Sequence, residues 1–198
     1  MVKTITNEEA KHIDWKISET GAQVKSLIEI AGYLAFDLIS THIIKEKSKI
    51  LVAIGPGHNG SDGLVIARYL KMNGHDVTLI YEKIKHEDLL LYALNCKVEV
   101  GKEVEPKNYD FVIDAVFGFC GRMPLQSPYD KMVTSFQNHP NIISIDVPSS
   151  EDLHVENLVT FIAPKSVKNC KNVYLTRSFF PRHVYDDEND YLNHKKLI

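Results

Sequence analysis

The chain has 198 residues, of which 44% are hydrophobic, 25% charged and 9% aromatic, and its formal net charge at pH 7 is −3. This composition is typical of a folded globular domain and excludes a disordered chain, a collagen-like repeat and a low-complexity segment. The near-neutral charge also excludes a strong overall field for nucleic acid or anionic lipid. The cysteines are few, widely spaced and without a CxxC pair, which argues against a disulfide framework or a zinc site and favours a reducing compartment. They are Cys96, Cys120 and Cys170.

The amino terminus lacks the apolar run of a signal peptide, and the most hydrophobic stretch, residues 26–44, is interrupted by Glu29 and Asp37. A membrane span needs about 20 nearly uncharged residues, so we expect no span here and predict a cytoplasmic protein.

No repeat or linker divides the sequence. We therefore treat residues 1–198 as one domain, with the last dozen residues as an extension.

The predicted elements begin with a helix whose first turn carries a capping box of Thr6 and Glu9, with Asn7 as a competing cap. A second helix follows at 24–39, where apolar residues recur at steps of three and four. Beyond it, strands and helices alternate, which predicts an α/β fold with a parallel sheet and helices on both faces. The predicted strands are 50–54, 76–81, 110–116, 141–147, 158–163 and 172–176, and the predicted helices are 64–72, 87–95 and 128–137.

Three polar loops follow strands of this sheet. They are residues 55–63 (GPGHNGSDG), the loop from Asp114 to Arg122, and residues 146–150 (DVPSS). In open parallel sheets, ligands bind beyond the carboxyl ends of the strands, near the point where the strand order reverses. We therefore expect the three loops to meet at one site.

The first of these loops matches GxGxxG through Gly55, Gly57 and Gly60, and Glu82 lies about 20 residues further on. This is the pattern of a dinucleotide-binding loop, in which the backbone approaches a pyrophosphate at a helix N-terminus. A glycine-rich connection without chemical function would give the same pattern. Asn59 adds a side-chain oxygen that a plain loop of this kind lacks.

Two aspartates, Asp114 and Asp146, stand near the ends of hydrophobic strands. A carboxylate there is costly to bury unless it is paired, hydrogen-bonded or bound to a metal, although an Asp can also cap a following helix. Asn59, Asp114 and Ser149 offer hard oxygen ligands. Such ligands suit an alkali or alkaline-earth cation better than zinc.

These motifs together resemble one known family. The segments 55–63, 114–119 (DAVFGF) and 144–150 (SIDVPSS) are similar to GPGNNGGDG, DAIFGFS and DIPSG of the YjeF N-terminal domain, the NAD(P)H-hydrate epimerase family. Residues 27–32, 163–165 and 179–181 resemble further segments of it. The resemblance implies a Rossmann-like three-layer α/β/α sandwich with a mostly parallel central sheet, usually as a homodimer.

The resemblance also implies an activity and a site. The family interconverts the R and S forms of hydrated NAD(P)H, and Asp146 is the acid/base residue that we expect to act at the hydroxyl-bearing ring carbon. One potassium ion per subunit would be held by Asn59, Asp114 and Ser149. The substrate contacts implied are His58, Asn59, Gly60, Ser61, Asp62, Gly118, Phe119, Cys120, Gly121, Arg122, Met123, Pro124 and Asp146. His58, Ser61 and Ser150 replace an Asn and two Gly residues of the family pattern.

Two other interpretations remain open at this point. YjeF N-terminal domains also serve as non-catalytic dimerisation and RNA-associated modules in the enhancer of mRNA decapping, and residues 157–184 contain no acid among several basic residues. Those bases can meet phosphates of RNA or of a dinucleotide, or form a solvated face. The retained aspartates favour the enzyme. A hydride-transferring dehydrogenase built on GxGxxG and Glu82 lacks a recognisable substrate domain.

Overall fold

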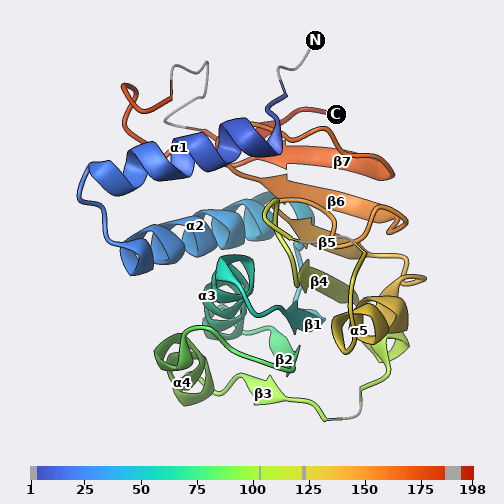
Figure 1. Ribbon diagram of the computed structural model, residues 1–198. Coiled ribbons are helices and arrows are strands. Elements are labelled where there is room, and N and C mark those ends of the chain that lie inside the picture. Colours follow the sequence, from blue (N-terminus) through green and yellow to red (C-terminus); the bar gives the residue numbers. More distant parts are fainter. Residues whose placement is uncertain (1–3, 103, 122–123, 186–192) are drawn as a thin grey trace.

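The computed structural model describes residues 4–102, 104–121, 124–185 and 193–198. Eight strands form one sheet in the order β3-β2-β1-β4-β5-β6-β7-β8 (Figure 1). All neighbouring pairs are parallel except β7 and β8. The strands are β1 (Lys49–Ile54), β2 (Asp76–Tyr81), β3 (Glu99–Val100), β4 (Phe111–Ala115), β5 (Ile142–Ile145), β6 (Val155–Thr160), β7 (Cys170–Leu175) and β8 (Lys195–Lys196).

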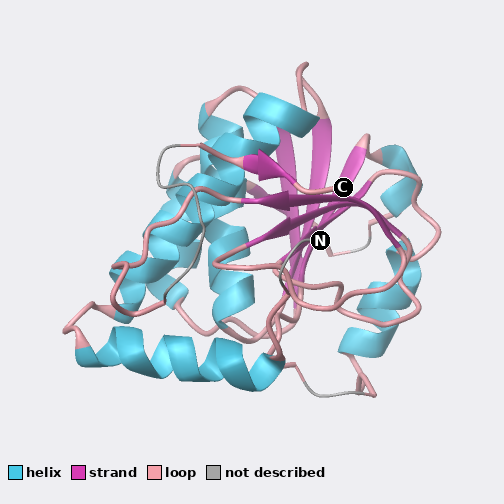
Figure 2. Ribbon diagram, turned by 90° about the horizontal axis from the view of Figure 1, so that it is seen from above, coloured by secondary structure: helices cyan, strands magenta, loops and turns pink. Residues whose placement is uncertain are grey.

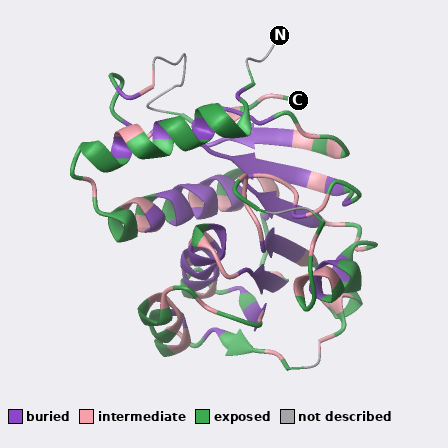
Figure 3. Ribbon diagram, in the orientation of Figure 1, coloured by how far each residue is buried: buried purple, intermediate pink, exposed green. Residues whose placement is uncertain are grey.

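Helices cover both faces of this sheet, as Figure 2 shows. In β1, Ile50, Val52 and Ile54 pack into a core with the four helices that lie between residues 7 and 95, whereas Leu51 and Ala53 pack into a second core with the helix at residues 129–136. Burial on both sides explains why the central strands are almost uniformly apolar, and Figure 3 shows them buried. The helices are α1 (Asn7–Glu19), α2 (Val24–Leu38), the π-helical turn η1 (Ile39–Ile43), α3 (His58–Met72), α4 (Glu87–Asn95), the 3₁₀ turn η2 (Pro106–Asn108) and α5 (Tyr129–Phe136).

The predicted α/β fold with a mostly parallel sheet is confirmed, and so is the first helix cap. The Thr6 hydroxyl accepts a hydrogen bond from the backbone N–H of Glu9 at 3.1 Å, and the Glu9 carboxylate accepts one from the Thr6 N–H at 2.7 Å. Asn7 is the first residue inside the helix rather than its cap.

The prediction for helix α3 was wrong at its start, because the helix begins at His58 instead of residue 64. Glycines inside the segment suggested a loop, but here they allow close packing. A Cβ on Gly60 would lie 2.0 Å from the carbonyl oxygen of Gly55, and one on Gly63 would lie 2.6 Å from the Cβ of Ala115. The glycines therefore let the helix lie directly against the ends of β1 and β4.

The last six residues of the chain pair with the sheet, although the sequence suggested an extension. Within residues 193–198, β8 pairs antiparallel with β7, and the Leu197 N–H donates to the Val173 carbonyl at 2.7 Å. His194 accepts a hydrogen bond from the Arg177 N–H at 3.0 Å, which ties this segment to the end of β7. Part of the predicted extension, residues 186–192, lies outside the described residues.

One helical segment, Val24–Ile43, is long and apolar enough to cross a membrane by length and composition, which the sequence reasoning had excluded. Core helices of soluble proteins pass the same test. In this fold α2 contributes Ala31, Ala35 and Leu38 to the core between the helices and the sheet. The packing accounts for the apolar character of the segment without a membrane.

Candidate functional site at the carboxyl edge of the sheet

The three polar loops meet at the point where the strand order reverses. The chain runs from β1 outward to β2 and β3, and then returns to place β4 on the other side of β1. The Gly55 N–H donates to the Ala115 carbonyl at 3.1 Å, and a Cβ on Gly55 would lie 1.6 Å from the Val116 carbonyl oxygen. The predicted convergence of the loops after β1, β4 and β5 is therefore confirmed.

A cavity of about 930 Å³ lies at this edge. Its volume falls within the range of small-molecule and cofactor sites, about 300–1,000 Å³. Much of its wall is apolar, and a few polar side chains converge on it. The polar and charged side chains that line it include Asp14, His58, Asn59, Asp62, Lys85, Cys120, Asp146 and Lys165.

The first two turns of α3 divide their side chains between the cavity and the protein interior. His58, Asn59 and Asp62 line the cavity, because residues three and four apart share one face of a helix. Gly60 packs on Gly55, and the Ser61 hydroxyl lies 2.8 Å from Nδ1 of His86. The structure thus places Gly60 and Ser61, two predicted substrate contacts, outside the lining of the cavity.

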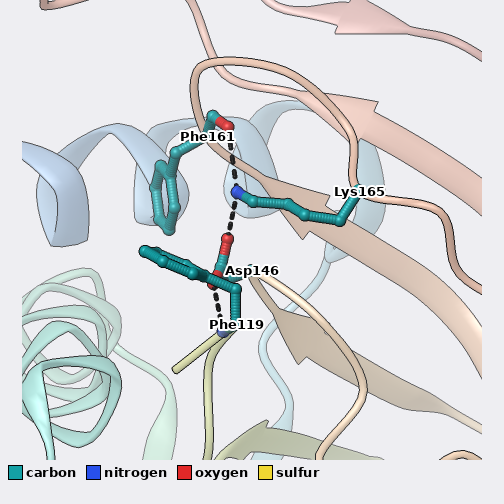
Figure 4. Close-up of polar contacts among 4 residues, drawn as sticks. All are labelled: Phe119, Asp146, Phe161 and Lys165. Carbon is teal, nitrogen blue, oxygen red and sulfur yellow. Dashed lines mark hydrogen bonds and ion pairs between the residues drawn. The ribbon is translucent and has the colours of Figure 1, made fainter. Parts of the chain in front are cut away.

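Asp146 lines the cavity, and it is almost fully buried. Its Oδ1 accepts a hydrogen bond from Nζ of Lys165 at 2.5 Å, and its Oδ2 accepts one from the Phe119 backbone N–H at 2.9 Å (Figure 4). Nζ of Lys165 also donates to the Phe161 carbonyl at 3.3 Å. A carboxylate with a buried cationic partner and a backbone donor is held in one orientation, facing the cavity.

Backbone strain accompanies this arrangement. Asp146 has φ of 70° and Ile162 has φ of 66°, values in the left-handed region that residues other than Gly, Asn and Asp rarely adopt, so the strain falls mainly on the β-branched Ile162. Both residues line the cavity. Such strain costs about 1–3 kcal/mol per residue and persists where the surrounding structure imposes it, most often at functional sites.

Asp114 connects the ends of β4 and β5. Its carboxylate is fully buried and accepts hydrogen bonds from the Ser149 hydroxyl at 2.5 Å, the Ser149 N–H at 2.9 Å and the Ser144 hydroxyl at 2.9 Å. Burial raises the pKa of Asp114, and these hydrogen bonds oppose the rise. Among the described residues, no basic side chain forms an ion pair with it.

Of the three predicted cation ligands, Asn59 is the one whose side chain has no hydrogen-bond partner among the described residues. Its side chain is 9% exposed, and neither Oδ1 nor Nδ2 has a hydrogen-bond partner among the described residues. A Cβ on Gly118 would lie 3.5 Å from the Asn59 side chain and 2.8 Å from Oδ2 of Asp146. A buried amide oxygen without a partner is suited to accept a ligand such as an oxygen-liking cation.

Two further acids share the cavity with Asp146. Burial raises the pKa of Asp62 well above its ordinary value, and the negative charges of Asp146 and Asp14 act in the same direction. At Asp14, on α1, partial removal of water raises the pKa to about 6, with Asp146 adding to the rise and Lys165 opposing it. Burial and neighbouring charges therefore raise the pKa of two carboxyl groups that line the cavity together with Asp146.

Most of the predicted site residues reach the cavity. His58, Asn59, Asp62 and Asp146 line it, and so do five residues of the loop after β4, whereas Arg122 and Met123 lie outside the described residues. The five are Gly118, Phe119, Cys120, Gly121 and Pro124.

Sequence reasoning missed the roles of Lys165 and Asp14. It grouped Lys165 with the basic residues of 157–184, as a phosphate contact or part of a solvated face, but the side chain is 4% exposed and pairs with Asp146. Two other bases of that stretch, Lys171 and Arg177, form ion pairs with Glu156 and Asp37. Two features of the sequence pointed to these roles. Lys165 follows a predicted strand end, and Asp14 lies next to the apolar positions of its helix.

The fold and the site together define a Rossmann-like α/β protein with a cofactor-sized pocket at the switch point of its sheet. Residues 24–167 match the family model of the YjeF-related protein N-terminus, and the chain belongs to this family. An NAD(P)H-hydrate epimerase of Entamoeba histolytica is 32% identical over 202 residues, covering 92% of this chain and 91% of the relative. One of Plasmodium knowlesi is 31% identical over 195 residues, covering 86% of this chain and 67% of the relative.

A solved structure supports the fold. The crystal structure of the yeast protein YNL200c superposes with a TM-score of 0.80 and covers 99% of this chain and 100% of its own, at 24% sequence identity. The similarity extends to the whole three-layer arrangement, including parts of the chain outside residues 24–167.

Proposed function

We propose that this protein is an NAD(P)H-hydrate epimerase, an isomerase that interconverts the R and S forms of hydrated NADH or NADPH. The observation that carries the proposal is the buried Asp146–Lys165 pair, which points a carboxylate into the cavity at the switch point of the sheet. The relatives named above as NAD(P)H-hydrate epimerases support the same conclusion.

The chemistry needs few groups. The hydrated nicotinamide carries a hydroxyl on a carbon next to the ring nitrogen, and inverting that centre requires loss and return of water, or ring opening and reclosure. Either route needs a proton donor and acceptor beside the hydroxyl. Lys165 and the Phe119 N–H hold the Asp146 carboxylate for this role, and the apolar side chains of Phe119 and Phe161 limit water around it.

The direct test is to incubate the protein with purified R-hydrate of NADH and to follow formation of the S form by chromatography, against a protein-free blank. We expect Asp146→Asn to lower the rate by about 100-fold or more, the usual contribution of a positioned acid/base group, with dinucleotide binding nearly unchanged. Asp76→Asn is the matched control, because this exposed residue begins β2 at the opposite edge of the sheet. Undiminished turnover in Asp146→Asn would refute the assignment.

We also propose that Asn59, Asp114 and Ser149 hold one potassium ion per subunit. The unpartnered amide of Asn59 and the hydrogen-bonded Asp114 carboxylate support this, since a bound cation would satisfy the first and balance the charge of the second. When bound, the ion would offset phosphate charge and fix the loops after β1 and β4.

The test of the cation is thermal unfolding in potassium chloride and in choline chloride at equal ionic strength. A ligand that binds only the folded state raises the melting temperature with its concentration. We expect this rise for the wild type and its loss in Asn59→Ala. Equal melting temperatures of the wild type in the two salts would rule out the site.

The family resemblance further leads us to propose a homodimer. Exposed apolar side chains on α1 and α2 support it: Trp15 is 54% exposed, Val24 47% and Ile30 42%. Sedimentation velocity would measure the mass directly, and a species of 22.5 kDa at micromolar concentration would contradict the proposal.

A further inference from the structure

Inversion of the hydrated carbon sets a requirement that Asp146 does not meet alone. The hydroxyl leaves from one face of the nicotinamide ring, and water returns to the opposite face. A single carboxylate, fixed by Lys165 and the Phe119 N–H, reaches one face of a bound ring. A second proton-transfer group is therefore needed on the other face.

Asp62 is the group placed for this. It lines the same cavity from the second turn of α3, an element separate from the β5 loop that carries Asp146. Its carboxyl has no hydrogen bond or ion pair among the residues that the structure describes, in contrast to Asp146 and Asp114. One turn earlier on the same face of α3, the buried and unpartnered Asn59 side chain marks this wall as ligand-facing.

We propose, resting on the epimerase activity above, that the Asp62 carboxyl gives its proton to the departing hydroxyl on one face of the ring, and that Asp146 accepts the proton of the water that adds to the other face. The C–O bond breaks with its electron pair on oxygen, water leaves, and the lone pair of the ring nitrogen forms a C=N bond. Water then adds to the opposite face, the C=N pair returns to nitrogen, and Asp146 takes the released proton. Exchange with solvent returns a proton to Asp62 and removes one from Asp146. The reverse reaction uses the two groups in exchanged roles.

The charges around the site support this division. Lys165 pairs with Asp146 at 2.5 Å, and this contact holds the Asp146 carboxyl group in place in the cavity. Asp62 has no such partner, and burial together with the charges of Asp146 and Asp14 raises its pKa, which favours the protonated form that a donor needs. Two groups with environments that differ in this way are the usual arrangement of an acid and a base in one site.

Other titratable groups of the cavity fit the donor role less well. Asp14 is exposed, and with a pKa of about 6 it is mostly ionised at pH 7. Burial, Lys85 and His86 lower the pKa of His58, whose ring stacks on that of His86 with centroids 5.8 Å apart. Burial raises the pKa of the Cys120 thiol, which makes it a weak acid.

The test compares wild-type protein, Asp62→Asn and Asp76→Asn with purified R-hydrate of NADH in water enriched in oxygen-18, followed by chromatography and mass spectrometry. We expect Asp62→Asn to lower kcat by about 100-fold or more with KM changed less than about threefold, because Asn keeps the shape of a neutral carboxyl but does not donate an acidic proton. The wild type should place one solvent oxygen in each S product. Retention of the original oxygen would overturn the C–O cleavage and the donor role of Asp62.

The dependence of kcat on pH separates proton donation by Asp62 from a purely structural role of this residue. The kcat of the wild type should fall at alkaline pH as Asp62 loses its proton. Asp14→Asn removes one of the charges that hold this proton, so it should shift the alkaline limb to lower pH. An active wild type with an unmoved limb in Asp14→Asn, or with undiminished kcat in Asp62→Asn, would overturn this proposal alone. A wild type that does not epimerise would refute the proposed function itself.

Discussion

Replacement of Lys165 by Met tests how much of the fold depends on the pair at the site. The side chains of Lys165 and Asp146 are 4% and 8% exposed, so solvent screens their interaction only weakly. Met keeps most of the volume of the Lys stem and leaves the Asp146 carboxylate buried without its cation. Removing one partner of a buried pair costs about 3–5 kcal/mol.

Acid/base equilibrium limits the loss to less than the upper end of that range. The stranded carboxylate can escape by taking up a proton, and at pH 7 this costs an ordinary aspartic acid about 4 kcal/mol. We therefore expect Lys165→Met to lower the free energy of unfolding by about 3–4 kcal/mol at pH 7. Urea unfolding followed by far-ultraviolet circular dichroism measures this, with the slope of the transition as a check on two-state behaviour.

Two controls make the measurement decisive. Lys171→Met breaks the ion pair of Lys171 with Glu156, in which the two side chains are 71% and 31% exposed. This change should lower the free energy of unfolding by no more than about 1 kcal/mol. The double variant Lys165→Met/Asp146→Asn removes both charges and should recover a large part of the stability. A loss below about 1 kcal/mol in Lys165→Met would show that the pair is not buried as described and would refute the reasoning.

Two further predictions concern stability. The pKa of Asp14 rises from 3.8 in the unfolded chain to about 6 in the folded one, so the folded state binds more protons between these values and loses stability as pH rises from about 4 to 6. Asp14→Asn should flatten this dependence of the free energy of unfolding on pH, measured by urea unfolding at pH 4, 5, 6 and 7. An unchanged pH dependence would contradict the assignment. Gly60→Ala should lower the free energy of unfolding by about 1–3 kcal/mol, because the added Cβ would meet the Gly55 carbonyl. Gly57→Ala should cost much less, because no atom lies within 4 Å of a Cβ added there. Similar urea midpoints for the two variants would argue against the close packing.

Local sequence patterns predicted most of the elements because each depends on neighbours in the chain. The predicted ranges 76–81 and 87–95 coincide with β2 and α4. The start of α3 was misplaced because Gly60 and Gly63 are poor helix formers by themselves. What keeps them helical is contact with Gly55 and Ala115, a tertiary effect that no local pattern contains.

The site was predicted to a similar extent. Strand-end positions placed Asp146 at the cavity, and the family motifs added Asn59 and the loop after β4. The partner of Asp146 could not be predicted, because Lys165 lies 19 residues further along the chain, after a different strand. Its basic neighbours in sequence pointed to a phosphate contact or a solvated face, and neither includes a carboxylate partner. Only the folded structure shows that parallel strands β5 and β6 bring the two ends together.

The surroundings of the site depend on segments outside the family match. Residues 24–167 contain Asp62, Asp146, Lys165 and the candidate cation ligands, whereas Asp14 comes from α1. The charge of Asp14 raises the pKa of Asp62, and no hydrogen bond joins the two carboxyl groups among the described residues. A change at position 14 would therefore alter the acid strength of Asp62. Since the best acid/base group has a pKa close to the working pH, we expect Asp14→Asn to move the pH optimum of the proposed reaction.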